Sequence, residues 1–373
     1  MATGKWSLFA DRFEARKPAS EMTKLDAILD FFAFITISIG YIIQSIFYTI
    51  FGWPEKDLNG ELCVITGGGG GLGRLLAMRL VRLGVKVILW DISQQGLDES
   101  KKIVDSMGGW CRSQIVDISK RQEVYKAAED IKNQYGNVTL LINNAGVLSG
   151  RALLDTPDHL IERSFNVNVI AHFWTVKAFL PTMIEKDHGH IVTIASMAGH
   201  VGIAKLIDYC STKFAAVGFD EALRLELEVM GIKNIHTSVI CPYFIQATGM
   251  FDDVNSRWVN TLSSNDVADR IIEAVRKNEK MALIPWYFNI MLILKTIFPW
   301  GCTSGFLRRL VPDATPQHLL TTPVSTPSIT KQEEMQFMNN NNHHVLNNNN
   351  NNNDKETTLI KRMAATIEGE RVL

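Results

Sequence analysis

The sequence has no excess of charge of either sign: 38 lysines and arginines stand against 39 aspartates and glutamates in 373 residues, and the formal net charge is −1. This balance gives no electrostatic reason to expect nucleic acid as a partner. The five cysteines lie far apart, include no C-x-x-C pair and are odd in number, which argues against a disulfide framework and favours reduced thiols facing the cytosol. The nine histidines show no metal-ligand spacing, so no metal site is predicted.

Charge is missing altogether from residues 31–53, an apolar run of 23 residues. As a helix rising ~1.5 Å per residue the run would reach about 34 Å, enough to cross a hydrocarbon core of about 30 Å. A mixed-charge segment over 1–30 precedes it and no small-residue cleavage site follows, which is untypical of a secretory signal. The sequence therefore predicts a membrane anchor over 31–53, with a buried soluble helix as the alternative.

The orientation of this anchor stays open. Lysines and arginines before the run favour a cytosolic N-terminus, and a single span would then place the rest of the chain in the lumen. That placement conflicts with a folded domain on the cytosolic side. A hairpin or a helix lying in the membrane plane would resolve the conflict.

Between residues 58 and 285, short β-branched runs alternate with helix-length segments. The runs are almost continuously apolar, as expected for parallel strands covered on both faces. This alternation predicts one α/β domain with a Rossmann-type, doubly wound parallel sheet of about seven strands. The expected strands are Leu62–Thr66, Val85–Trp90, Trp110–Val116, Val138–Asn143, His190–Ala195, Ile235–Ile240 and Ala282–Pro285.

A glycine run follows the first expected strand and opens an amphipathic helix. Glycines allow a tight turn and let the backbone approach a pyrophosphate, which would lie against the positive N-terminal end of the helix. The spacing Thr-Gly-x-x-x-Gly-x-Gly has one residue more between its first two glycines than the usual dehydrogenase fingerprint. Its place between a strand and a helix argues against a flexible linker. The predicted dinucleotide loop consists of Thr66, Gly67, Gly71, Leu72 and Gly73.

The second expected strand is followed by Asp91, eighteen residues after Gly73. A carboxylate there can accept hydrogen bonds from the adenosine ribose and would repel a 2′-phosphate. No lysine or arginine lies within 67–71 to attract that phosphate, so NAD is predicted over NADP. This preference depends on where Arg74 and Arg112 lie, because either cation could bind the phosphate. Asp117, after the third strand, would lie further along the same ligand, with a plain surface aspartate as the alternative.

Tyr209 and Lys213 stand four residues apart in an expected helix, so their side chains share one face. A lysine ammonium near a phenol favours the phenolate and lowers a reference pKa of ~10. Tyr209 is then usable as a general acid or base near neutral pH. Thirteen residues upstream, Ser196 ends a strand at the sheet edge where ligands bind. There it can hydrogen-bond a substrate oxygen and orient it toward the phenol.

In type, order and spacing these motifs resemble those of the short-chain dehydrogenase/reductase family over residues 58–285. The resemblance rests on Thr66–Gly73, Asn143-Asn144-Ala145-Gly146, Ser196 and Tyr209-x-x-x-Lys213. It implies that the glycine loop and Asn144, Ala145 and Gly146 lie at a nicotinamide cofactor. It also implies that Ser196 positions the substrate oxygen, that Tyr209 exchanges the hydroxyl proton, and that Lys213 lowers the Tyr209 pKa and binds the nicotinamide ribose.

Three further positions match the family. Asn168 matches its catalytic asparagine and would hold a water in the proton relay. Pro242 matches the first residue of a Pro-Gly segment, although Tyr243 stands here in place of the glycine. Thr248 matches the threonine that usually holds the nicotinamide carboxamide.

Several segments, among them Leu89–Ile92 and Thr248–Phe251, are similar to those of the membrane-bound retinol dehydrogenases and 17-beta-hydroxysteroid dehydrogenases. This implies an enzyme at the endoplasmic reticulum membrane or lipid droplets, with a cytosolic catalytic domain, that oxidises a lipophilic alcohol with NAD. All-trans-retinol is the preferred substrate, and a 17-beta-hydroxysteroid or another lipid alcohol is the alternative. A membrane scaffold that kept the fold without activity is the alternative of a different class. A homo-oligomer is expected from the resemblance alone.

The remaining segments bear on substrate and membrane. Met250, Phe251, Val254 and Trp258 either line an apolar substrate slot or pack in the core. Residues 285–299 are almost entirely apolar, with Lys295 as the only charged residue, and they are too few to span a bilayer. Residues 286–312 are therefore predicted to dip into the membrane as a substrate-entry segment, with a core helix or subunit contact as the alternative. The Asn-rich tail over 313–373 is predicted to be disordered.

Overall fold

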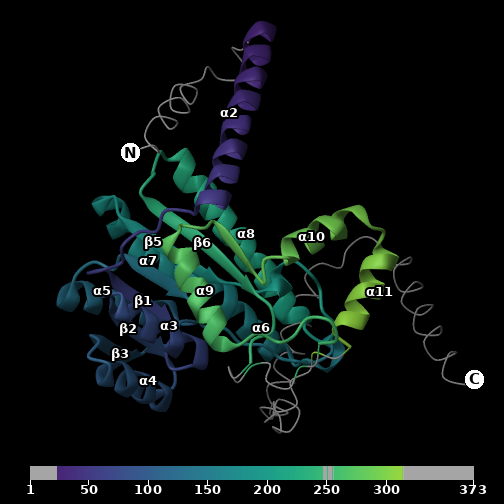
Figure 1. Cartoon of the computed structure of the whole chain (residues 1–373). Coiled ribbons are helices and arrows are strands. Elements are labelled where there is room, and N and C mark those ends of the chain that lie inside the picture. The colour runs from purple at the N-terminus through teal and green to yellow at the C-terminus, as the bar shows by residue number, and fades with distance from the viewer. Residues whose placement is uncertain (1–22, 247–249, 251–253, 255, 313, 315–373) are drawn as a thin grey trace, which may run out of the picture. The chain divides into compact units, whose positions relative to one another are not determined.

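The computed structural model describes residues 23–246, 250, 254, 256–312 and 314. Seven strands form one parallel sheet: β1 (Leu62–Thr66), β2 (Lys86–Asp91), β3 (Cys111–Ile115), β4 (Leu140–Asn143), β5 (Gly189–Ile194), β6 (Ile235–Pro242) and β7 (Met281–Ile284). Their order is β3-β2-β1-β4-β5-β6-β7 (Figure 1). This confirms the predicted doubly wound sheet, and every strand lies within two residues of its expected bounds.

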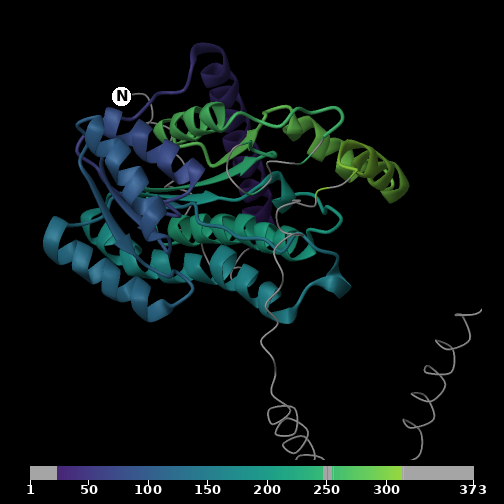
Figure 2. The ribbon, with the colours of Figure 1, turned by 90° about the horizontal axis from the view of Figure 1, so that it is seen from below.

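Helices cover both faces of the sheet (Figure 2). One layer contains α3 (Gly71–Arg82), α4 (Gln94–Ser106) and α9 (Ser264–Arg276), and the other contains α5 (Arg121–Tyr135), α7 (Ala171–Lys186) and α8 (Ile207–Val229). Because successive residues of a strand point to opposite faces, β1 contributes side chains to the hydrophobic cores on both faces of the sheet. Cys63 and Ile65 pack under the first layer, whereas Leu62 and Val64 pack under the second.

The edge strand β3 departs from the expectation of burial on both faces. Only Cys111 is buried in it, and Ile115 is 55% exposed. An edge strand has a neighbouring strand on one side only, which leaves its outer side open to solvent.

The direction of the strand order reverses between β1 and β4, which makes their carboxyl ends the expected ligand crevice. Four short elements lie on the way from this edge into the helices. They are η2 (Leu153–Asp155), α6 (Asp158–Phe165), the π-helical turn η3 (Asn166–Ile170) and η4 (Met197–Gly199). The π-turn continues directly into α7 and carries Asn168.

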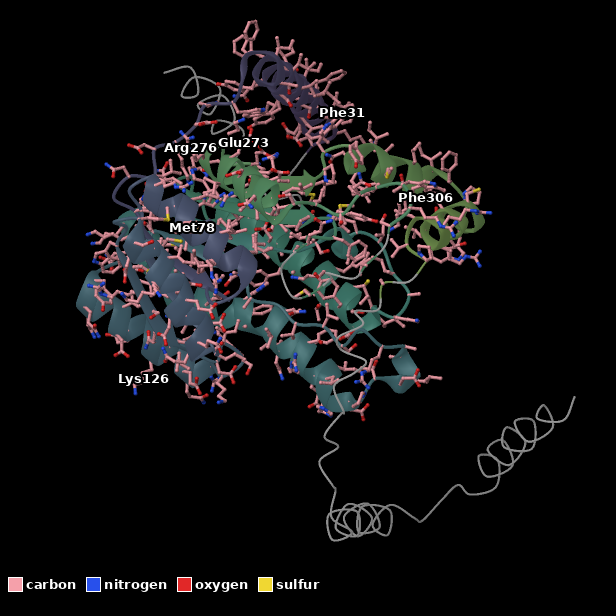
Figure 3. All side chains as sticks on the ribbon, turned by 60° about the horizontal axis from the view of Figure 1, so that its bottom comes forward. Phe31, Met78, Lys126, Glu273, Arg276 and Phe306 are labelled. Carbon is pink, nitrogen blue, oxygen red and sulfur yellow. The ribbon has the colours of Figure 1, made fainter. Side chains whose placement is uncertain are left out.

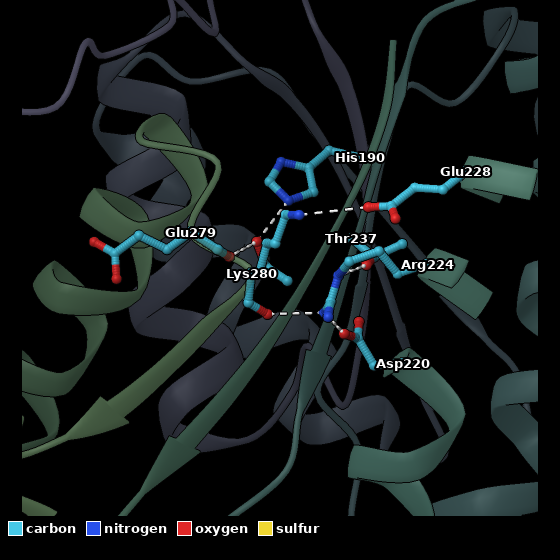
Figure 4. Close-up of polar contacts among 8 residues, drawn as sticks. His190, Asp220, Arg224, Glu228, Thr237, Glu279 and Lys280 are labelled. Atoms are coloured by element: carbon cyan, nitrogen blue, oxygen red, sulfur yellow. Dashed lines mark hydrogen bonds and ion pairs between the residues drawn. The ribbon is translucent and has the colours of Figure 1, made fainter. Parts of the chain in front are cut away.

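A polar network fixes the C-terminal half of α8 to the sheet (Figure 4). Arg224 pairs with the fully buried carboxylate of Asp220 and donates to Thr237 Oγ1 on β6 (3.0 Å) and to the carbonyl of Lys280 beside β7 (3.0 Å). The N-terminal half of α8, about two to three turns away from this network, carries Tyr209 and Lys213.

The helix α2 (Lys24–Phe51) has 28 residues and contains no buried residue. It begins seven residues before the predicted anchor because Thr23 and Asp26 form a capping box, and it ends at Gly52. The mean hydropathy of its most apolar 18-residue window is 1.8, and large apolar side chains, such as Phe31 (Figure 3), are exposed. By length and composition α2 can cross a bilayer, which fits a membrane anchor. The stretch Asp158–Lys186 is also long and apolar, but it is partly buried in the folded domain, whereas α2 is not buried at all.

Candidate active site

Thr66 holds two loops together at the carboxyl edge. Its Oγ1 accepts hydrogen bonds from the amides of Asn144 (3.0 Å) and Ala145 (3.1 Å). In return, Asn144 Nδ2 donates to the carbonyls of Thr66 (2.9 Å) and Gly67 (3.2 Å). The segment after β4 thus fixes the backbone of the glycine loop after β1. Thr66 itself is 1% exposed and acts on the loop from behind.

The glycine loop leaves no room for side chains. Gly67 has φ of 68°, and a Cβ on it would come within 2.9 Å of Ala145 Cα. A Cβ on Gly73 would lie 2.2 Å from the carbonyl oxygen of Gly67. The N-cap of α3 is Gly70, which has no side chain to cap the helix, and the first residues of α3 line a cavity of about 1020 Å³. These backbone amides at a helix N-terminus fit the pyrophosphate of a dinucleotide.

Asp91 also lines this cavity, with Asp117 beside it. Asp91 Oδ2 accepts from the amide of Gly69 (3.0 Å) and Oδ1 from that of Ser93 (2.9 Å). The carboxylate therefore lies against the glycine loop, where an adenosine ribose would bind. Asp117 Oδ1 accepts from the amide (3.1 Å) and hydroxyl (2.6 Å) of Ser119.

The two arginines that could favour NADP both have other partners, although Arg74 also lies at the glycine loop, where its guanidinium donates to the carbonyl of Gly69 (3.4 Å). Arg74 forms an ion pair with Glu99 (2.8 Å) and donates to Ser100 Oγ (3.0 Å). Arg112 donates to the carbonyl of Cys111 (2.8 Å) and lies over the Trp110 ring, 4.8 Å from its centroid.

Tyr209 and Lys213 occupy the first two turns of α8, and both are buried. Lys213 Nζ donates to the carbonyl of Ile194 (2.8 Å) and lies 5.5 Å from the centroid of the Tyr209 ring. Ser196 forms the N-cap of η4 and hydrogen-bonds Tyr209. Its Oγ accepts from the amide of Ala198 (3.1 Å). The three side chains meet in the same cavity as the glycine loop.

The pKa of Tyr209 differs in direction from the expectation. Burial raises this pKa well above its ordinary value and outweighs the lowering effect of the hydrogen bond with Ser196. Burial also lowers the pKa of Lys213 to about 8. The reason is that both charged forms lose their hydration inside the protein, so phenolate and ammonium are both disfavoured. In the protein without cofactor, Tyr209 is therefore a neutral phenol.

Asn168 lies next to the catalytic group but outside the lining of the cavity. Its Oδ1 accepts from the amide of Val147 (2.8 Å), and its Nδ2 donates to the Val147 carbonyl (2.8 Å) and to Thr212 Oγ1 (3.0 Å). The side-chain amide thus binds the segment after β4 to α8. Gly146 lies beside it, since a Cβ there would be 3.5 Å from Asn168 Oδ1 and 3.7 Å from Lys213 Nζ.

Pro242 ends β6 and lines the cavity. Its carbonyl oxygen lies 3.4 Å from Ser196 Oγ. Tyr243, in place of the family's glycine, turns its ring onto Phe288, with 5.2 Å between centroids, and its hydroxyl bonds Ser256 Oγ (2.8 Å). Thr248 lies outside the described residues, as do Phe251 and, apart from Ala314, the tail over 313–373.

The other end of the cavity is mainly apolar and is formed in part by α10 (Phe288–Ile297) and α11 (Trp300–Leu310). Of the residues expected in a substrate slot, Met250 lines the cavity. Val254 packs in the core instead, and Trp258 is exposed and stacks on Phe306. The apolar lining residues from the two helices include Phe288, Met291, Leu292, Phe306 and Leu307, with Phe298 between the helices, and Lys295 and Arg308 line the cavity too.

Sequence reasoning missed the polar residues behind the cavity wall. Thr175 donates to Asn143 Oδ1 (2.8 Å), Thr212 binds Asn168, and Asp208 accepts three hydrogen bonds. In the sequence, each of these residues is visible only as a polar residue among apolar ones. That pattern does not show which residue it binds in the folded protein.

A glycine-lined helix N-terminus and a Ser-Tyr-Lys group in one cavity define a nicotinamide-dependent oxidoreductase. The family model for short chain dehydrogenases matches residues 61–258. The chain belongs to this family, and it is an oxidoreductase that acts on CH–OH donors with NAD or NADP.

Three relatives match most of the chain. Short-chain dehydrogenase/reductase family 16C member 6 of Bos taurus is 43% identical over 73% of this chain and 87% of its own. Estradiol 17-beta-dehydrogenase 11 of Rattus norvegicus is 39% identical over 76% and 95%. Epidermal retinol dehydrogenase 2 of Homo sapiens is 40% identical over 72% and 88%. A solved short-chain dehydrogenase/reductase from Burkholderia phymatum, in complex with NAD, superposes with a TM-score of 0.60 at 25% identity, covering 65% of this chain and 95% of that one.

Proposed function

We propose that the protein oxidises all-trans-retinol to retinal with NAD. The observation that carries this proposal is the continuity of one cavity, which joins the glycine loop, the Ser-Tyr-Lys group and an apolar chamber. The relative named for retinol supports the substrate. The relative named for estradiol supports a 17-beta-hydroxysteroid as the second candidate, because a steroid is also flat, apolar and alcohol-bearing.

The proposed mechanism assigns one task to each side chain. Ser196 holds the substrate hydroxyl oxygen beside Tyr209. The phenolate oxygen of Tyr209 takes the hydroxyl proton, and Lys213 supplies positive charge near it. Asn168 holds the segment after β4 against α8. Bound NAD supplies the hydride acceptor at nicotinamide C4. For the reverse reaction Tyr209 donates the proton to the carbonyl oxygen.

The cofactor would be held by the glycine loop, by Asp91 and Asp117 at the adenosine, and by Asn144, Ala145 and Gly146 beside the nicotinamide half. Pro242, Thr248, Tyr209 and Lys213 complete the proposed set. We infer a preference for NAD because Asp91 lies against Gly69 while Arg74 and Arg112 are held by other partners. A 2′-phosphate would add negative charge beside a carboxylate.

The test is a turnover assay with all-trans-retinol and a 17β-hydroxysteroid, each with NAD and NADP. We expect retinol turnover with NAD and a kcat/KM ratio that favours NAD. Asp91→Ser should reduce that ratio on the order of 10- to 100-fold, because like charges in contact cost several kcal/mol and 1.4 kcal/mol is tenfold. Asp98→Ser, an exposed aspartate on α4, is the matched control. Steroid turnover alone would overturn the retinol proposal, and an unchanged ratio in Asp91→Ser would overturn the cofactor argument.

We further propose that α10 dips into the membrane, so that a lipophilic alcohol enters the chamber without crossing water. The helix has two apolar faces. Phe288, Met291 and Leu292 line the cavity, whereas Ile290 and Ile293 are 51% and 60% exposed on the other side. The exposed face continues through Trp286 and Ile297, and Phe298 and Trp300 are also exposed although they line the cavity as well. Lys295 lies on the inner side, where its ammonium donates to the His200 carbonyl. An uncharged stripe with tryptophans at its ends fits the membrane interface.

Charging this face should release the protein from membranes. In a variant that lacks residues 1–53, we expect Ile290→Asp with Ile293→Asp to lower vesicle binding in a flotation assay by at least ~10-fold, since two buried aliphatic side chains contribute more than 1.4 kcal/mol. Ile115→Asp with Leu154→Asp is the matched control, because both residues are exposed apolar side chains elsewhere. Equal binding of the two double variants would contradict membrane entry at α10.

We propose the endoplasmic reticulum membrane or lipid droplets as the location, with the catalytic domain in the cytosol. The support is α2, which contains no buried residue and carries no charge after Asp30, and free cysteines at all five positions. We also propose a homo-oligomer. Its support is the exposed apolar side chains on α7 and α8, namely Phe173, Phe214, Leu225 and Val229.

A further inference from the structure

A buried carboxylate directly precedes Tyr209 on α8. Asp208 is 6% exposed and accepts three hydrogen bonds. Its Oδ2 accepts from the amide of Ser149 (3.1 Å) and from the hydroxyl of Ser164 (2.7 Å), and its Oδ1 accepts from the hydroxyl of Ser149 (2.8 Å). A buried carboxylate held by three donors is a specific arrangement, because an unmatched one would be strongly disfavoured.

The donors belong to two different elements around the site. Ser149 lies two residues after Val147, which lines the cavity. Ser164 lies in the last turn of α6, four residues before Asn168. Asp208 therefore joins the segment after β4, the helix α6 and the first turn of α8.

Asn168 joins the same region one turn further along. It binds Val147 on the segment after β4 and Thr212 on α8. Asp208 and Thr212 are four residues apart and share one face of α8. Tyr209 and Lys213 form the neighbouring stripe, which faces the cavity. The first two turns of α8 are thus held by hydrogen bonds at Asp208 and Thr212, on one side of the helix. Tyr209 and Lys213 face the cavity from the neighbouring side.

The first turn of α8 needs such support. Its N-cap is Leu206, whose side chain cannot accept a hydrogen bond from the free amides at the helix start. Helix ends without a polar cap fray readily. A displacement of about 1 Å in a catalytic group can cost on the order of 100-fold in rate.

We propose that Asp208 is a positioning residue for Tyr209. Its carboxylate clamps the first turn of α8 onto Ser149 and Ser164 and thereby sets the place of the phenol oxygen relative to Ser196. The role is one of geometry. An asparagine can reproduce most of it, because its oxygen can accept the two bonds made by Oδ2 and the Ser149 hydroxyl can turn to accept from its amide.

The experiment compares Asp208→Ala, Asp208→Asn and Asp220→Ala in the full chain. Asp220 is the matched control because it is a buried aspartate on the same helix, three turns away, in the network of Figure 4. Per folded enzyme, we expect Asp208→Ala to lower kcat by on the order of 100-fold with little change in KM. Asp208→Asn should stay within about 5-fold of the wild type, since it keeps most of the bonds. Asp220→Ala should lower the thermal midpoint without lowering kcat.

A second measurement is independent of the substrate, because the choice of alcohol rests on the proposed function. Amide hydrogen exchange should become faster over residues 207–213 in Asp208→Ala and remain unchanged there in Asp220→Ala. Ser164→Ala, which removes one donor, should show the same change to a smaller degree if Asp208→Ala does not fold. Three results would overturn the proposal. They are an equal loss of kcat in Asp208→Ala and Asp220→Ala, a kcat in Asp208→Asn as low as in Asp208→Ala, and unchanged hydrogen exchange over residues 207–213 in Asp208→Ala. If the wild type turned over neither retinol nor the steroid, only the proposed substrate would be contradicted, and the hydrogen-exchange measurement would still test the role of Asp208.

Discussion

Tyr209→Phe is expected to reduce turnover by on the order of 10³-fold while the protein stays folded. In the proposed mechanism the phenol exchanges the substrate proton, and proton transfer by a positioned side chain contributes ~10²–10⁴-fold. The ring is buried against its surroundings, so phenylalanine keeps the packing. The measurement is steady-state turnover of the best alcohol substrate together with a thermal melt.

Tyr135→Phe is the control for this variant, because Tyr135 packs on Trp110 at the end of α5, away from the cavity. It should leave turnover within about 2-fold of the wild type, as surface substitutions usually do. Full activity in Tyr209→Phe would contradict the assigned proton exchange.

The pH profile gives a second expectation for the same residue. Oxidation requires the phenolate, and burial raises the pKa of Tyr209. The phenolate fraction of the free enzyme, and with it kcat/KM for oxidation, should therefore rise with pH through neutrality. The rise should weaken above pH 8, because the pKa of Lys213 is about 8 and its charge is then lost. Carbonyl reduction, which uses the neutral phenol, should change little between pH 6 and 8.

Gly73→Ala is expected to weaken NAD binding at least ~100-fold. The added Cβ would lie 2.2 Å from the carbonyl oxygen of Gly67, so the start of α3 must move away from the loop. A shift of about 1 Å in backbone amides that hold a pyrophosphate costs on the order of 100-fold. The measurement is NAD affinity by calorimetry, which needs no turnover.

Gly218→Ala is the matched control, because nothing lies within 4 Å of the new Cβ. In an exposed helix interior alanine is favoured over glycine by about 1 kcal/mol. The control should therefore keep NAD affinity and raise the thermal midpoint by a few degrees. Retained NAD affinity in Gly73→Ala would mean that the cofactor does not bind at this loop.

The sheet was predictable because its signals are local. A parallel strand buried on both faces needs only a run of apolar residues, and the strand–glycine–helix unit around Thr66 and Gly73 is continuous in sequence. The Tyr209 and Lys213 pair was predictable for the same reason, since four residues on a helix place two side chains on one face. The family follows from these motifs, and the comparisons confirm it.

The start of α2 was less predictable than its apolar run. The run without charge begins at Phe31, but the helix begins at Lys24 because the capping box of Thr23 and Asp26 stabilises charged first turns. Absence of charge marks what can lie in lipid, whereas hydrogen bonds at the end of a helix decide where the helix starts.

By itself the sequence determined the strands, the glycine loop and which residue types stand at the catalytic positions, because each depends on neighbours within a few residues. Only the tertiary structure decided how those residues behave. It engaged Arg74 with Glu99, turned Lys295 inward, and joined Asp208 to Ser149 and Ser164. It also reversed the expected direction of the Tyr209 pKa. Desolvation and hydrogen bonding depend on every group that packs around a side chain, and those groups come from segments far apart in the chain.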